Sequence, residues 1–478
     1  MRYLVIVIIA LSSCNLFAQK KGIKFYKQED SIKYQQISMM MSQGRSISVI
    51  NGKAIFKIVD SSYMNTAFNY DSLYQLLKEV PIYGYLSMTP NPDFCTLSEL
   101  KQSTRKDTIT HLSLSGKALK RLPIINILKC KTLKEIEITG ASIRKIPWVL
   151  NWRLFGLDSL HRLNIYNYEG GKPFKFSKNT QLKRLVYREN PRAPFPLGIR
   201  KLKNIEELNL VRNDFKKEVT FNLGSFVRLK EVNLSYNAID INNLTSKNND
   251  TLESLLLRFC KLTEVGDGIG YFKNLKELQL SENKITAPNI SPNISLLKEL
   301  QILSFYNNEL DSLPTSILAY PKLIELDLYH NQIDKIPSEI SQLRQLKKLY
   351  LANNTIYSIP EEIGELTELE ELYLKHNRIS YLPNSLSKLS KITDFHINNN
   401  YLQAFPECIL SFKNLQDLDV SFNNIHSLPP ALLTLPNLKL LWMRGITFEA
   451  RNQEEALSIK NTLEGLEAKG VKISVELD

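Results

Sequence analysis

A proline and an asparagine each return at one fixed interval in this sequence. Both recur every 23 residues across its second half. The prolines are Pro314, Pro337, Pro360, Pro383, Pro406 and Pro429, and the asparagines are Asn308, Asn331, Asn354, Asn377, Asn400 and Asn423. Two residue types that keep one period predict a chain built from stacked copies of a short structural unit.

The first half of each unit predicts a strand. The pattern is LxxLxLxxNxIxxLPxxIxxL, and in one copy Leu372 and Leu374 alternate with other residues. This alternation predicts a short parallel strand whose leucines face the core. Glu371, Tyr373 and Lys375 are then expected to face outward.

The second half of the unit predicts a turn and a short helix. Asn377 follows the strand, where its amide can bond buried backbone groups of the turn in every copy. Pro383, Leu386 and Leu389 recur at helical spacing. Proline suits a first helical turn, because its missing N–H would be unpaired there.

The upstream copies keep the asparagine position less strictly. The position is filled by Asn283, Cys260, Asn237, Asn213 and Asn190, and in weaker copies by Tyr168, Ala141 and Lys117. That makes fourteen units, with a partial strand at 437–446. Cys260 is expected to serve as a small partner for its turn.

This pattern is identified as a leucine-rich repeat. The units from about 300 to 435 resemble the 23-residue class of the Ras-group and Ras-suppressor type, and IPEEIGELTELEELYLKHNRI is close to that consensus. The resemblance covers residues 109–446. It implies an α/β solenoid, a curved horseshoe with a parallel β-sheet on its concave face and short helices or 3-10 turns on its convex face, that binds other molecules. Those relatives are largely intracellular, so their signalling partners are not carried over.

The N-terminus has the layout of an export signal. One basic residue, an apolar run from Tyr3 to Leu11 and a small-residue exit are typical of it. A membrane span would need about 20 apolar residues. Two exits compete: cleavage after Ala18, or a lipobox in which Cys14 would carry a lipid. Either predicts a secreted or cell-envelope protein, and the signal resembles those of exported Bacteroidetes proteins.

The segments flanking the repeats complete the predicted domain organisation. After a signal peptide at 1–18, residues 19–108 fit no repeat and form either a cap or a small domain, with a hairpin at 47–59 and a helix at 71–80. The solenoid follows over 109–446. Residues 447–478 read as a helix and a strand that cap its C-terminal end.

The charge of the repeat region is uneven. Residues 109–230 hold 25 lysines and arginines against 9 acidic residues, whereas residues 231–478 hold 23 against 32. The basic half favours acidic glycans or anionic surfaces. Its least regular part, residues 148–195, is either an eroded repeat or a secondary basic site. The candidate residues of that site are Arg162, Tyr166, Arg184 and Arg188.

The outward strand positions should stack into columns on the concave sheet. The central column supplies Asp327, Tyr350, Tyr373, His396, Asp419 and Trp442, and its neighbour supplies Glu371, Asp394 and Asp417. Aromatic side chains on a rigid sheet are typical of binding hot spots, and the carboxylates suggest a cationic partner. The same residues also suit an ordinary soluble surface, and the terminal helix could instead cover Trp442.

The motif content favours binding over catalysis. The chain has no GxSxG, HExxH, Walker or kinase signature, no Cys or His spacing typical of a metal site and no nucleic-acid motif. We therefore expect a non-catalytic scaffold without cofactor or metal that binds a protein through its concave face. The alternative is an adhesin that binds acidic glycan or an anionic cell surface through residues 148–195, and a structural spacer ranks third.

Overall fold

The computed structural model describes the repeat region most fully. The described residues are 94–115, 124–139, 157–167, 176, 181–190, 196, 198–216, 221–244, 247–450 and 452–474, together with the backbone of 45–50 and 53–58. The chain divides into two compact units, Met1–Asn91 and Pro92–Asp478. The export signal and the helix expected at 71–80 lie outside the described residues.

The first unit contains one described hairpin. Strand β1 (Arg45–Ile50) pairs antiparallel with β2 (Lys53–Ile58), and Ile50 faces Lys53 across the turn. This pairing confirms the hairpin expected at that place.

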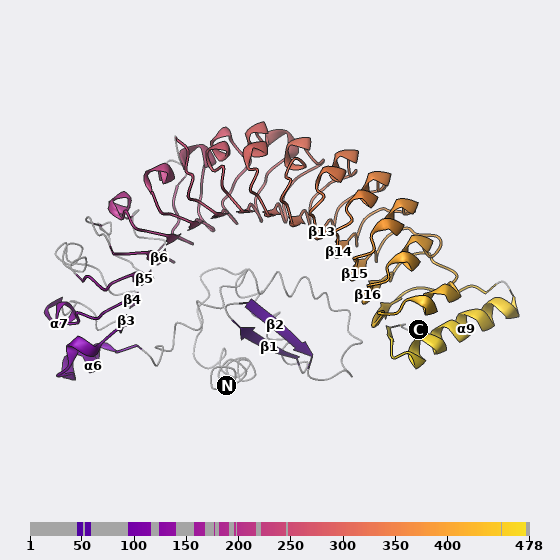
Figure 1. Cartoon of the computed structure of the whole chain (residues 1–478), viewed down its shortest axis with the longest axis horizontal. Coiled ribbons are helices and arrows are strands. Elements are labelled where there is room, and N and C mark those ends of the chain that lie inside the picture. Colours follow the sequence, from indigo (N-terminus) through magenta and orange to yellow (C-terminus); the bar gives the residue numbers. More distant parts are fainter. Residues whose placement is uncertain are drawn as a thin grey trace. The chain divides into compact units, whose positions relative to one another are not determined.

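The second unit is built on a parallel sheet of sixteen described strands that follow one another in chain order. The strands line the inner edge of a curved array, and the short helices lie on its outer edge (Figure 1). This arrangement confirms the expected solenoid. The strands are β3 (His111–Ser115), β4 (Glu135–Thr139), β5 (Arg162–Tyr166), β6 (Arg184–Arg188), β7 (Glu207–Asn209), β8 (Glu231–Asn233), β9 (Ser254–Leu256), β10 (Glu277–Gln279), β11 (Ile302–Ser304), β12 (Glu325–Asp327), β13 (Lys348–Tyr350), β14 (Glu371–Tyr373), β15 (Asp394–His396), β16 (Asp417–Asp419), β17 (Leu440–Trp442) and β18 (Lys472–Ser474).

Short 3-10 helices form the outer layer. They include η2 (Lys106–Thr108), η4 (Ile199–Lys201), η5 (Leu223–Ser225), η6 (Ile241–Asn243), η7 (Asp267–Tyr271), η8 (Ala287–Asn289), η9 (Pro292–Leu296), η10 (Thr315–Ile317), η11 (Ser338–Gln342), η12 (Glu361–Glu365), η13 (Asn384–Lys388), η14 (Glu407–Ser411) and η15 (Pro430–Thr434). The periodic proline is the N-cap of η10 to η15, one residue before the position expected. Its carbonyl explains the placement, since Pro383 O accepts from the Leu386 N–H at 3.2 Å.

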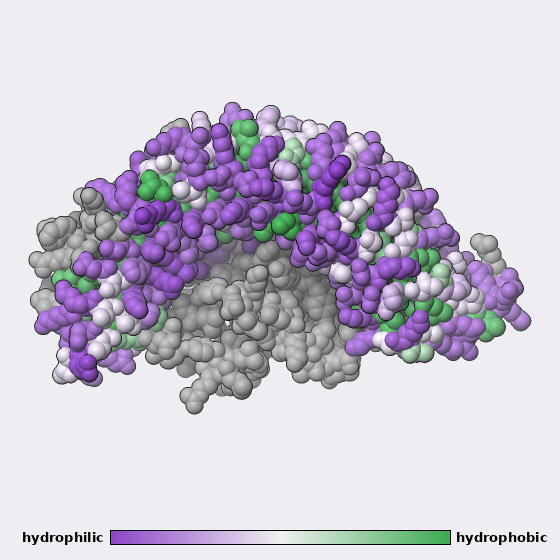
Figure 2. All heavy atoms as spheres, in the orientation of Figure 1, coloured by the Kyte–Doolittle hydropathy of each residue, from purple (hydrophilic) through white to green (hydrophobic). Residues whose placement is uncertain are grey.

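The core lies between the two layers. Leu372 and Leu374 are buried in it, as expected from their alternation, and Ile379 and Leu386 cover them from the turn and the 3-10 helix. The outer surface in view is largely hydrophilic with scattered apolar residues (Figure 2). Burial of these repeated aliphatic side chains holds each copy against the next, because no single repeat could enclose its own core.

The buried asparagine ladder is confirmed. Asn377 donates from Nδ2 to Leu374 O in its own repeat at 2.9 Å and to Leu351 O in the preceding repeat at 3.0 Å. Its Oδ1 accepts from the Ile356 N–H of the preceding repeat at 3.0 Å. One side chain therefore closes its own turn and fastens it to the neighbouring turn.

Cys260 replaces asparagine in this ladder, with its thiol as the donor and its backbone carbonyl as the acceptor. Its thiol lies 3.4 Å from Leu234 O, so it can donate, and burial raises the pKa of this thiol to about 12. A thiol is a poor acceptor. The Ile239 N–H, which an asparagine Oδ1 would bind, instead donates to the backbone carbonyl of Cys260 at 3.1 Å. The repeat thus keeps its bonds without an amide.

A second periodic feature lies just before the ladder position and was not predicted from the sequence. The residue before each ladder asparagine is left-handed, with φ of 55° at His330, 53° at Asn353, 52° at His376 and 55° at Asn399. Asparagine tolerates this conformation better than most residues. The recurrence of asparagine at this position in alternate copies is the sequence feature that indicates the left-handed conformation. Gly445, with φ of 62°, continues the series after β17.

Both ends of the sheet are closed by helical segments. Helix α6 (Leu97–Gln102) starts with a capping box at Thr96, and its Leu100 is buried in the core, while Cys95 bridges to β3. A short helix, α7 (Ile124–Leu128), follows β3. At the other end α9 (Gln453–Ala468) leads to β18, the last strand of the sheet. This is the helix and strand expected there.

Candidate functional site

The strand register aligns the predicted concave columns. In one column the pairing runs through Asp327, Tyr350, Tyr373, His396, Asp419 and Trp442. In the neighbouring column it runs through Glu371, Asp394 and Asp417. The equal length of the repeats produces this alignment, because each strand starts 23 residues after the one before. The nine candidate residues therefore lie on one continuous face.

These side chains are less open than expected. Asp327 is only 4% exposed and accepts hydrogen bonds from the Tyr329 N–H and from Ser304 Oγ, each at 3.1 Å. Lys375 is 6% exposed, and its Nζ lies 5.5 Å from the Tyr329 ring centroid. Strands about 4.8 Å apart let neighbouring side chains cover one another. Asp327 and Lys375 therefore belong to the outward-facing side of the strands, but neighbouring side chains bury them.

The centre of the face is a continuous aromatic stack. The rings of Tyr350 and Tyr373 lie 5.0 Å apart, and Tyr373 stacks on His396 at 4.5 Å with their planes 3° apart. Tyr350 Oη donates to Glu371 Oε2 at 2.5 Å, and burial raises the pKa of this tyrosine well above its ordinary value. Packed rings of this kind offer a contact surface that loses little entropy on binding.

Carboxylates border the stack on the C-terminal side. Asp417 is the shared partner, with Oδ2 3.6 Å from His396 Nε2 and Oδ1 accepting from Trp442 Nε1 at 3.0 Å. Burial raises the pKa of Asp394 and of Asp419, and the nearby Asp417 carboxylate adds to both shifts. Ionisation of Asp394 and Asp419 therefore lowers the stability of the folded state.

Trp442 is covered in part by the last strand. It lies beside Ser474 of β18 in the register, and the Arg444 guanidinium lies 5.2 Å from the Trp442 ring centroid. Arg444 Nε in turn donates to Ser474 Oγ at 3.2 Å. Trp442 thus joins the concave row to the C-terminal strand and remains half-buried.

We expect Asp419→Asn to raise the midpoint of thermal unfolding at pH 7 by a few degrees. The pKa of Asp419 is higher in the folded state, so stability falls as pH rises through that pKa, and asparagine removes this titration. Calorimetry from pH 4 to 8 should show a flatter profile for the variant. Asp311→Asn, at an exposed turn residue, is the control. A lower midpoint for Asp419→Asn would mean that the attraction between the Asp419 carboxylate and His396 outweighs the cost of burying the charge.

The residues of the secondary basic site lie close together, and each of its arginines forms an ion pair. Arg162 pairs with Arg184 and Tyr166 with Arg188 in the register of β5 and β6, and the Arg188 guanidinium lies 5.9 Å from the Tyr166 ring centroid. Each arginine also meets a carboxylate. These ion pairs are Arg162 with Glu135 at 3.7 Å, Arg184 with Glu207 at 3.0 Å and Arg188 with Glu189 at 2.7 Å. Much of the surrounding segment 148–195, including Trp148, lies outside the described residues.

Metal sites and membrane-spanning helices are absent from the described part of the chain. There, no three His, Cys, Asp or Glu side chains are grouped so that they could hold a metal ion. Nor does any described helix combine the length and the apolar composition that crossing a membrane requires.

The repeat region can now be placed among known proteins. Residues 268–448 match the family model described as a leucine-rich repeat region. This chain therefore contains a leucine-rich repeat region. The matched part contains strands β10 to β17, so all nine concave candidates lie inside it. No curated protein matches the sequence significantly.

Solved structures share the fold of this chain. A leucine-rich repeat protein of Leptospira interrogans is 28% identical, with a TM-score of 0.62 over 79% of this chain and 98% of that one. Toll of Drosophila, solved as a complex with Spätzle, is 19% identical, with a TM-score of 0.62 over 79% of this chain and 50% of that one. An internalin of Listeria monocytogenes is 16% identical, with a TM-score of 0.51 over 73% and 88%.

Proposed function

We propose that this leucine-rich repeat protein is a non-catalytic scaffold that binds a protein partner through its concave face. The observation that carries the proposal is the stack of Tyr350, Tyr373 and His396, bordered by the carboxylates of Asp394 and Asp417. Aromatic residues at the centre of a patch with charged groups beside them are typical of binding hot spots. We propose all nine concave candidates as contacts or supports of this site.

The electrostatics of the site favour a partner that presents a lysine or arginine. Burial disfavours the ionised forms of Asp394 and Asp419. A cation placed beside them would therefore be attracted more strongly than beside solvent-exposed carboxylates. The face of a tyrosine also attracts a cation. We therefore infer a basic side chain at the centre of the partner's contact surface.

The comparisons support a binding role in general terms. The Drosophila Toll structure is a complex of that protein with Spätzle. We extend to this chain only the use of the repeat fold for holding a protein ligand. We further assign its repeats to the 23-residue class that resembles the Ras-group type, in an exported bacterial protein like those of the Bacteroidetes.

We propose that the protein is exported and acts in the medium or at the cell envelope. The layout of residues 1–18 supports this location. Intact mass of the exported product distinguishes cleavage after Ala18 from a lipid on Cys14. A product that keeps Met1 and all eighteen residues would contradict the proposal.

The concave site is tested by comparing two matched variants. Tyr350→Ala, Tyr373→Ala and Trp442→Ala remove the row, whereas Tyr271→Ala and Tyr357→Ala remove two exposed aromatic side chains elsewhere. Wild type and both variants, checked for folding, are used to capture proteins from envelope and medium extracts of the source cell. We expect the concave variant to lose at least tenfold of one captured protein and the control to keep it.

Two outcomes would reject the concave proposal. In one, both variants capture the same protein as well as the wild type does. In the other, wild type and variants hold only acidic glycan that salt elutes, which would favour the adhesin alternative. The ion pairs of Arg162, Arg184 and Arg188 would weaken the contacts of these three arginines with an anionic ligand.

A further inference from the structure

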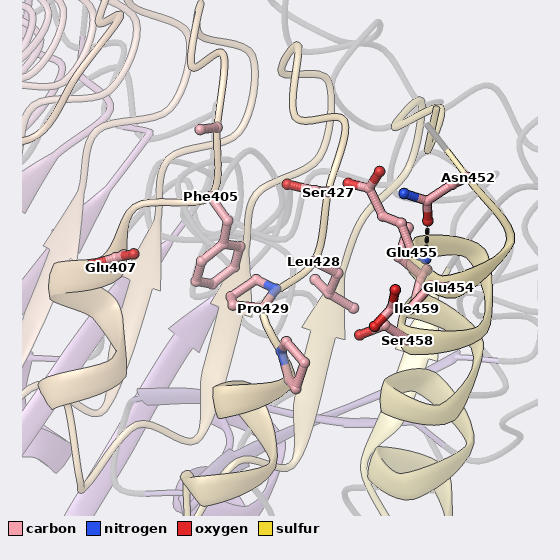
Figure 3. A pocket seen from close by; sticks show the side chains of 12 residues that line it. Phe405, Glu407, Ser427, Leu428, Pro429, Asn452, Glu454, Glu455, Ser458 and Ile459 are labelled. Carbon is pink, nitrogen blue, oxygen red and sulfur yellow. Dashed lines mark hydrogen bonds between the residues drawn. The ribbon is translucent and has the colours of Figure 1, made fainter. Parts of the chain in front are cut away.

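A groove lies beside the last repeats, away from the concave row. Its volume is about 570 Å³, and it is bounded by the turns before η14 and η15 on one side and by the first turns of α9 on the other. Its floor is apolar, formed by the largely buried side chains of Phe405, Leu428 and Ile459. Figure 3 shows Phe405, Pro429 and Leu428 between the two walls.

Carboxylates occupy both walls of this groove. Glu407 stands at the start of η14, and Glu454 and Glu455 stand opposite it on the first turn of α9 (Figure 3). Asn452 Oδ1 caps that turn by accepting from the Glu455 N–H at 2.8 Å. Within the described residues neither Glu407 nor Glu454 forms an ion pair, so their charges face the groove without a cation.

The packing of α9 explains why the groove stays open. A Cβ added to Gly465 would lie 2.8 Å from Leu433 Cδ2, so the later half of the helix sits tightly on η15. Lys469 Nζ donates to Leu433 O on the same side. The first turn of α9 lies more than two turns away from that contact and borders the groove instead.

Exposed tyrosines continue the surface beyond the groove. Tyr381 is 60% exposed and occupies, one repeat earlier, the position that Ala404 occupies in the groove lining. Tyr401 is 54% exposed, and its N–H donates to Ile379 O at 2.8 Å, which stacks the two loops. These are more open than the concave tyrosines. We call Tyr381 and Tyr401 the tyrosine strip.

The same stacked loops already hold a cation on a tyrosine. Lys335 Nζ lies 5.4 Å from the Tyr357 ring centroid, one repeat before Tyr381. Lys335 and Ser358 are bridged in parallel, which shows that equivalent loop positions of successive repeats lie side by side. The open rings of the strip can accept a partner's cation in the same way.

We propose that the groove and the tyrosine strip bind an extended peptide segment of another protein that carries arginine or lysine beside apolar residues. The apolar floor takes an aliphatic stem or an apolar side chain, the carboxylates on the two walls take the cationic head, and the strip takes a second basic residue. A groove of this volume is large enough for a few residues. The site is separate from the concave face and does not depend on the function proposed for it.

Fluorescence anisotropy with a defined probe tests this proposal. The probe is a labelled nonapeptide with two arginines separated by two apolar residues, and its analogue has glutamine in place of both arginines. Glu407→Gln, Glu454→Gln and Glu455→Gln are combined in the groove variant. Glu309→Gln, Glu361→Gln and Glu362→Gln, three exposed acidic residues of earlier repeats, give a control with the same net charge.

The proposal predicts a distinct pattern across these proteins. The wild type and the control should bind the arginine probe equally, the groove variant should bind at least tenfold more weakly, and Tyr381→Ala with Tyr401→Ala should bind about threefold more weakly. The concave variant should bind like the wild type. Equal loss in groove and control variants, equal binding of the glutamine analogue, or no binding to the folded wild type would overturn the proposal.

Discussion

Asn377→Ala is expected to lower the free energy of unfolding by about 3 kcal/mol. The substitution removes four hydrogen bonds of a buried amide. The three carbonyls keep a second donor, because Asn400 Nδ2 bonds Leu374 O, Asn354 Nδ2 bonds Leu351 O and the Asn353 N–H bonds Lys375 O. The Ile356 N–H has no such substitute, and an unpaired buried donor costs about 1–3 kcal/mol by itself. Urea unfolding followed by circular dichroism measures the loss.

Two further variants distinguish the loss of the ladder hydrogen bonds from the effect of replacing any asparagine. Asn384→Ala, at an exposed position in η13, should leave the unfolding curve unchanged. Asn377→Cys should fall between wild type and alanine, because Cys260 shows that a thiol can donate in this position while the backbone supplies the missing acceptor. If alanine and cysteine proved equally destabilising, the account of Cys260 would be wrong.

Gly364→Val is expected to destabilise the protein by about 2–3 kcal/mol. A Cβ at this position would lie 2.5 Å from Ser385 O and 2.8 Å from Ser385 Cβ in the next repeat. The backbone carbonyl belongs to the stacked 3-10 layer and cannot move without parting η12 from η13. Thermal unfolding of the full chain should therefore begin at a lower temperature in the variant.

The control for this prediction lies one repeat earlier. Ser341 occupies the equivalent position in η11 and already carries a Cβ. Ser341→Val should therefore cost much less than Gly364→Val. Comparable losses would show that β-branching in a 3-10 helix, and not the close approach of two repeats, determines the effect.

The repeat itself could be read from the sequence because its determinants are local and recur. Leu372 and Leu374 face the core and Asn377 closes the turn, as their spacing predicts, and Pro383 lies one residue before its expected place in the outer helix. Each depends on contacts within one copy or with the adjacent copies. A fixed period of 23 residues then aligned the concave columns in register, so their composition could be predicted residue by residue.

Exposure and pairing could not be read in the same way. Whether Asp327 or Lys375 is covered depends on the side chains one and two repeats away, which the pattern of a single copy does not contain. The arginines Arg162 and Arg184 looked like a basic site, and only the stacking of strands showed their carboxylate partners. Charge counted along a chain ignores such neighbours.

The groove depends even more on contacts between distant parts of the chain. It exists because Gly465 seats α9 on the last repeat while the first turn of that helix stands beside Phe405 and Leu428. The repeated pattern determined the fold of the solenoid, since the copies have similar residues at the positions that form the strand, the turn and the outer helix. Its surfaces were decided by tertiary contacts between non-equivalent residues, because burial and charge pairing depend on neighbours that no repeat pattern specifies.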